Sequence, residues 1–136
     1  MYHIVKPNVT ISAPPGTVRL YWIATGLFTL LFVASIILTF GDLETSYFQY
    51  ARLGFANWVV FFNGTAKFLG LIAILYNQSR TLKEFAFAGF LFDIILAMTT
   101  HIIRQDTYLL VAIFGLVVWI FAFVMHRRVY PINDKL

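Results

Sequence analysis

The chain of 136 residues contains no cysteine, and only 12% of its residues are charged. Without cysteine it has no disulfide, no thiolate metal site and no dithiol redox relay of its own. It also lacks a glycine-rich phosphate loop, a nucleophile elbow and a histidine pair at metal-ligand spacing, so no metal site is expected. The first nineteen residues contain three prolines and no apolar core, a pattern that does not predict a signal peptide.

A basic stripe with interleaved aromatic residues is also absent, although the net charge is +4. The basic residues stand singly or in pairs between apolar runs, which is typical of loops that flank membrane spans and contact lipid headgroups. No nucleic-acid partner is therefore expected.

Apolar residues, in contrast, make up 60% of the chain, whereas an ordinary soluble domain has roughly 45–50%. A soluble fold of this size cannot bury so much apolar surface, because small domains have a large surface-to-volume ratio. Membrane lipids are therefore the first expected partner.

Four apolar runs predict four spanning helices, because a helix that rises about 1.5 Å per residue crosses a ~30 Å hydrocarbon core in such a run. The fold class is therefore all-α, a four-transmembrane-helix bundle, and residues 1–136 are expected to form a single membrane domain. The Pro14-Pro15-Gly16 run argues against regular helix before the first span. The predicted spans cover about residues 20–41, 53–78, 85–103 and 108–125.

The first connection has a helical pattern of its own, with Leu43, Tyr47, Tyr50 and Gly54 at i, i+4, i+7 and i+11. This spacing predicts a short amphipathic helix over Asp42–Arg52 that lies at the membrane surface. A disordered loop with a few tyrosines is the alternative left open at this point.

The basic residues are distributed unequally between the two sides of the predicted bundle. Only Arg52 and Arg104 fall on the side of the first and third connections. By the positive-inside rule, this asymmetry predicts that both termini lie in the cytoplasm. The expected location is the bacterial inner (cytoplasmic) membrane. The opposite side carries Lys6, Arg19, Arg80, Lys83, Arg127, Arg128 and Lys135.

Two charges interrupt the apolar runs, Lys67 in the second and Asp93 in the third. Each costs about 2.5–3.5 kcal/mol at the centre of a spanning helix, so neither is expected to face lipid. Both lie thirteen residues from position 80 in the intervening loop, which places them at the same depth. Both also share a helix face with small residues that permit close packing. The sequence therefore predicts a Lys67–Asp93 ion pair between these two helices, with Asn63 and His101 as further polar partners.

Two interpretations of this pair stay open. A buried pair fixes helix register, and it also serves as a site that binds a polar group or relays protons. His101 has a plainer explanation as a lone interfacial histidine. The candidate ligand-binding residues are Asn63, Lys67, Asp93, Thr100 and His101, and the candidate catalytic residues among them are Asp93, Lys67 and His101.

The third run also contains a specific string, Leu82-Lys83-Glu84-Phe85-Ala86-Phe87-Ala88-Gly89-Phe90-Leu91-Phe92-Asp93, with His101 eight residues later. Together with Ala51-Arg52-Leu53-Gly54-Phe55 and Ala66-Lys67-Phe68-Leu69-Gly70, it closely resembles the DoxX-like family of small four-helix membrane proteins, over about residues 20–128. The chain departs from the family at Ala56, where a proline is common. It also lacks the family's lysine shortly after Ser35, so no role is carried over from that lysine.

The resemblance implies the fold and a link to redox biology, since relatives in the wider DoxX group are associated with thiosulfate–quinone oxidoreduction and with oxidative-stress complexes. The first hypothesis is a non-catalytic membrane subunit that binds a lipophilic molecule, such as a quinone or another isoprenoid lipid, and docks a membrane or redox protein partner. The second is a small membrane enzyme that uses Asp93 and Lys67 on a lipid-soluble substrate. The third is a proton-coupled carrier, which four helices permit only as a homo-oligomer.

Overall fold

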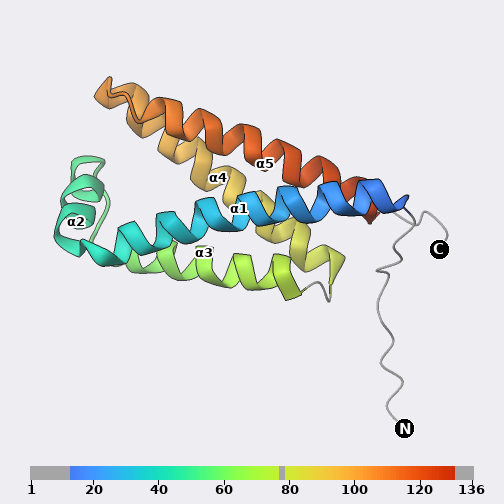
Figure 1. Ribbon diagram of the computed structural model, residues 1–136. Coiled ribbons are helices and arrows are strands. Elements are labelled where there is room, and N and C mark those ends of the chain that lie inside the picture. Colours follow the sequence, from blue (N-terminus) through green and yellow to red (C-terminus); the bar gives the residue numbers. More distant parts are fainter. Residues whose placement is uncertain (1–12, 77–78, 131–136) are drawn as a thin grey trace, which may run out of the picture.

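The computed structural model describes residues 13–76 and 79–130, which are entirely helical apart from short turns (Figure 1). The expectations for Lys6, for residues 77–78 and for Lys135 lie outside these residues. The helices are α1 (Pro15–Gly41), α2 (Leu43–Arg52), α3 (Trp58–Tyr76), α4 (Arg80–Arg104) and α5 (Leu109–Val129). All except α2 are long and apolar enough to cross a membrane. The expected four-helix membrane bundle is therefore confirmed.

The four spans form a ring in which α1 contacts α5 and α3, and α4 contacts the same two helices. α1 and α4 therefore face each other across the ring. α2 lies at the end where α1 finishes and α3 begins, here named the α2 end (Figure 1). The opposite end, where α4 begins, is named the Ser79 end.

Phenylalanine rings of α1 and α4 fill the middle of the ring. The ring centroids of Phe28 and Phe90 are 4.9 Å apart, and those of Phe32 and Phe90 are 4.4 Å apart. All three rings are almost completely buried. On the outside, large apolar side chains such as Leu38 and Phe92 are more than 70% exposed, as expected for surfaces that face lipid.

α1 and α4 both begin five residues earlier than expected. The expectation that the Pro14-Pro15-Gly16 run excludes regular helix before the span at residue 20 is wrong for Pro15 onward, because Pro15 occupies the first helical position, where the missing N–H needs no partner. α4 begins at Arg80 because Ser79 caps it, its Oγ accepting a hydrogen bond from Leu82 N at 3.3 Å. Glu84 then pairs with Arg80 one turn away, at 3.0 Å.

α3 and α5 also differ from their expected bounds. α3 starts at Trp58 instead of Leu53, because Gly54 has a φ of 83° and ends the preceding helical turn. α5 continues to Val129 instead of Met125, so the basic residues after Met125 lie in its last turn. Cations are favourable there because the end of a helix carries partial negative charge.

α2 forms as a helix over Leu43–Arg52, which rules out the disordered-loop alternative. Asp42 caps it, accepting a hydrogen bond from Thr45 N at 3.0 Å. Hydrogen bonds from the side chain and backbone of Thr45 also lower the pKa of the Asp42 carboxyl. Ser46 Oγ donates to Thr39 O at 2.9 Å, which ties α2 to the last turns of α1.

Candidate functional site

The carboxylate of Asp93 on α4 is held by two side chains of α3. Lys67 Nζ lies 3.2 Å from Asp93 Oδ2, and Asn63 Nδ2 donates a hydrogen bond to Asp93 Oδ1 at 2.9 Å. Asn63 and Lys67 are four residues apart, so they lie on one face of α3. The side chain of Lys67 is 9% exposed and that of Asp93 is 15% exposed. Each oxygen of the carboxylate therefore has a polar partner in an environment with little access to solvent.

Two further hydroxyl groups complete this polar cluster, and the sequence reasoning missed both. Lys67 Nζ donates to Ser35 Oγ of α1 at 3.1 Å. Asn63 Nδ2 donates to Tyr50 Oη of α2 at 2.7 Å. The sequence offers a weak signal for Tyr50, which lies on the apolar face of α2, and for Ser35, a polar residue within an apolar span. The cluster therefore joins four helices.

A cavity of about 660 Å³, named the central cavity, opens between α1, α2, α4 and α5. Ser35 and Asp93 contribute to its wall, together with the apolar side chains of Leu31, Phe32 and Ile94. Its lining extends along α4 to Arg104. Arg104 is eleven residues from Asp93, a distance of about 16 Å at 1.5 Å per residue. The central cavity therefore runs from the α2 end to the depth of Asp93.

At the α2 end, His101 and Arg104 both approach Asp106. His101 Nδ1 is 2.8 Å from Asp106 Oδ1, and Arg104 Nε is 3.5 Å from Asp106 Oδ2. These are ion-pair distances without hydrogen-bond geometry, since neither His101 Nδ1 nor Asp106 Oδ2 has a hydrogen-bond partner among the described residues. Asp106 Oδ1 accepts a hydrogen bond from Tyr108 N at 3.1 Å, which fixes the carboxylate in the turn between α4 and α5.

The five residues predicted as ligand-binding fall into three groups. Asp93 and His101 line the central cavity. Asn63 and Lys67 lie behind Asp93 and hold it. Thr100 lies outside the lining, and its hydroxyl donates to Leu96 O of its own helix at 2.8 Å. Among the described residues, no group of three or more His, Cys, Asp or Glu side chains is placed to hold a metal ion.

A second buried polar cluster occupies the Ser79 end and was also missed. Lys83 is 1% exposed, donates to Tyr21 Oη at 2.7 Å and lies 4.3 Å from the ring centroid of Tyr130. His126 is fully buried nearby, and its ring centroid is 5.7 Å from that of Tyr130. The sequence reasoning treated Lys83 as a loop charge because the third span was expected to begin at residue 85. The earlier start of α4 instead places this lysine inside the bundle.

The family model described as the DoxX-like family matches residues 23–125. The match includes most of α1, all of α2, α3 and α4, and most of α5, and therefore the whole Asp93 cluster. No curated protein and no solved structure matches the chain.

Proposed function

The chain belongs to the DoxX-like family, and we propose that this integral membrane protein is a non-catalytic binding subunit for an oxygen-bearing lipophilic molecule, such as a quinone. In this proposal the ligand occupies the central cavity, and a membrane redox or stress-response complex supplies the protein partner. The membrane is the bacterial inner membrane, with the Ser79 end in the cytoplasm.

The central cavity is the observation that supports this proposal. Its volume of about 660 Å³ falls in the range of roughly 300–1,000 Å³ that is usual for small-molecule sites. Such sites combine mainly apolar walls with a few converging polar groups. Leu31, Phe32 and Ile94 are apolar walls of this kind, and Ser35 and Asp93 are polar groups beside them. A molecule that is mostly apolar and carries one polar end fits this lining.

The hydrogen bonds within the cluster indicate what the polar end contains. Ser35 Oγ accepts from Lys67, and Tyr50 Oη accepts from Asn63, so each hydroxyl keeps its own proton to donate. Ser35 and Tyr50 both line the cavity, as does the acceptor Asp93. A carbonyl oxygen suits the two hydroxyl donors, and a hydroxyl group suits the carboxylate. A quinone and its reduced form present these two groups.

The test is to identify the molecule that copurifies with the full chain in mild detergent, by native mass spectrometry and lipid extraction. We expect a quinone or another oxygenated isoprenoid at a stoichiometry near one. Ala112 lines the central cavity, so Ala112→Phe should remove most of the bound molecule by filling its space. Ala88 is exposed on the outer side of α4, so Ala88→Phe is the matched control and should leave the bound molecule in place.

Phospholipid alone in the wild-type extract, or equal ligand loss in both variants, would contradict the proposal. A copurified compound that the protein converts, with conversion lost in Asp93→Asn, would favour a membrane enzyme instead. Retained binding without conversion favours the binding subunit.

A further inference from the structure

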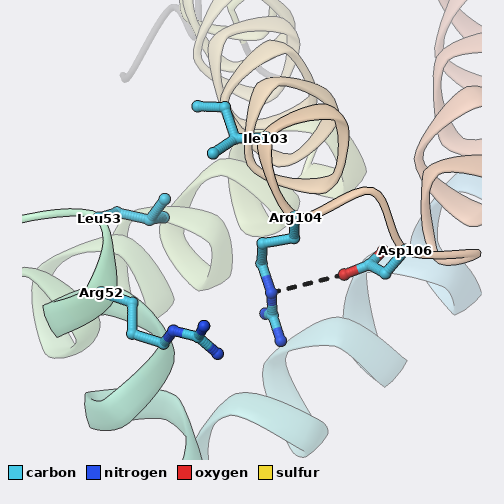
Figure 2. A pocket seen from close by; sticks show the side chains of 5 residues that line it. All are labelled: Arg52, Leu53, Ile103, Arg104 and Asp106. Atoms are coloured by element: carbon cyan, nitrogen blue, oxygen red, sulfur yellow. Dashed lines mark ion pairs between the residues drawn. The ribbon is translucent and has the colours of Figure 1, made fainter.

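A separate cavity of about 380 Å³, named the arginine cavity, lies between the last turn of α2 and the last turn of α4. Five side chains line it, and Figure 2 shows that they come from α2 and the residue after it, from α4, and from the turn after α4. They are Arg52, Leu53, Ile103, Arg104 and Asp106.

The charges around the arginine cavity are unbalanced. In Figure 2 the guanidinium groups of Arg52 and Arg104 turn toward the same space. Asp106 Oδ2 lies 3.5 Å from Arg104 Nε. Arg52 lies 5.5 Å from the ring centroid of Phe48, and no acidic side chain of residues 13–76 or 79–130 pairs with it. Two positive charges therefore face the cavity with one negative charge beside them.

Two guanidinium groups that share a cavity repel each other, and an anion placed between them removes this repulsion. Arginine presents its donors in a planar fork that matches the oxygens of a phosphate group. The chemistry of the arginine cavity is therefore that of a phosphate or phosphodiester site.

The position of the arginine cavity indicates the source of the phosphate. Arg104 is the last residue of α4, at the end of a membrane span where lipid headgroups are found. Trp58 and Tyr108 at this end are 67% and 64% exposed, as in the aromatic belts of membrane proteins. Ile103 beside Arg104 is 68% exposed, so an apolar surface adjoins the charged one. A phospholipid needs an apolar surface for its acyl chain directly beside a charged surface for its headgroup.

We propose that the arginine cavity binds the phosphate of an anionic phospholipid, with Arg52 and Arg104 as its ligands. The inference does not depend on a ligand in the central cavity. Arg104 lines both cavities, so the lipid headgroup sits beside the opening of the central cavity.

The test titrates the full-length protein in detergent with phosphatidylglycerol and, separately, with phosphatidylcholine, and counts bound lipids by native mass spectrometry. In Arg52→Gln/Arg104→Gln, we expect the affinity for phosphatidylglycerol to fall about tenfold or more, because charge-assisted hydrogen bonds are lost. Arg19→Gln/Arg128→Gln is the matched control. It removes two exposed charges from the Ser79 end and should leave this affinity unchanged.

An unchanged affinity in the Arg52→Gln/Arg104→Gln protein would overturn the proposal. An equal loss in the control protein would also overturn it, because binding would then follow net charge alone. Inorganic phosphate is the second probe. If it raises the thermal unfolding midpoint of the protein as much as phosphatidylglycerol does, the cavity is a site for a soluble anion instead. If Arg104→Gln prevents folding, Arg52→Gln alone carries the test, since Arg52 makes no ion pair within the described residues.

Discussion

Asp93 shows how a single carboxylate is accommodated inside an apolar bundle. A charge removed from water is costly unless it is paired and hydrogen-bonded. Lys67 supplies the opposite charge at 3.2 Å, and Asn63 supplies a hydrogen bond to the other oxygen. Ser35 in turn accepts a hydrogen bond from Lys67, so the cation also has two polar partners. Removing one member of such a set leaves the others without compensation.

We therefore expect Lys67→Met to destabilise the protein by about 3–5 kcal/mol, because it leaves the largely buried Asp93 without its counter-charge. The amount of monodisperse protein in detergent and its thermal unfolding midpoint measure this loss. Lys67→Met/Asp93→Leu should recover part of it, since the double change removes both charges. Arg128→Met, at an exposed position, is the control. Single changes at Lys67 and Asp93 that both leave the unfolding midpoint unaltered would show that the pair contributes no stability.

At the scale of elements, close packing of α3 against α4 depends on a glycine. A Cβ built on Gly70 would lie 2.9 Å from the ring of Phe90, which is only 3% exposed. Phe90 is itself packed against Phe28 and Phe32 of α1, so it has little room to move. Gly89 on α4 faces open space, where a Cβ meets nothing within 4 Å. The structure therefore has room for a side chain at position 89 of α4 but not at position 70 of α3.

Gly70→Ala should lower the stability of the bundle by about 1–3 kcal/mol, because the added methyl overpacks the core against Phe90. Gly89→Ala should be neutral or stabilising by up to about 1 kcal/mol, because alanine favours the helix and nothing obstructs it. Thermal or denaturant unfolding in detergent compares the two proteins. Equal effects of the two substitutions would show that the Gly70–Phe90 contact does not limit packing.

Across the whole molecule, the charges differ between the two ends of the bundle. The α2 end carries Arg52 and Arg104, whereas the described part of the Ser79 end carries five basic residues. Arg127 and Arg80 there also pair with Glu84, both at distances near 3 Å. Short basic segments are retained in the cytoplasm during insertion, so this difference favours a cytoplasmic Ser79 end.

Because the chain contains no cysteine, single cysteines report its orientation without background. Glu44 on α2 and Thr81 at the start of α4 are both exposed. A membrane-impermeant maleimide applied to intact cells should label Glu44→Cys, and should label Thr81→Cys only after the membrane is opened. The reverse labelling pattern would show that the Ser79 end faces outward.

The sequence predicted the position of some buried charged residues but not of others. The equal depth of Lys67 and Asp93 followed from counting, because the rise per residue of a helix is constant. Their contact also required that the two side chains lie on helix faces that meet, and the small residues were a mixed guide to those faces, since Gly70 packs against Phe90 but Gly89 faces open space. Lys83 could not be assigned in the same way. Its burial depends on where α4 begins, which the cap at Ser79 decides, and on Tyr21 of α1, which accepts a hydrogen bond from the lysine.

The sequence alone determined that this is a membrane bundle of four spans, and it favoured a short amphipathic helix after the first span, because apolar length and periodicity are properties of contiguous segments. Only the tertiary structure decided that α1 and α4 lie opposite each other, that Ser35 and Tyr50 join the Asp93 cluster, and that Arg52 and Arg104 line one cavity. Each of these features brings together side chains from helices distant in the sequence. Their meeting depends on the packing angles and order of the helices, which no local pattern records.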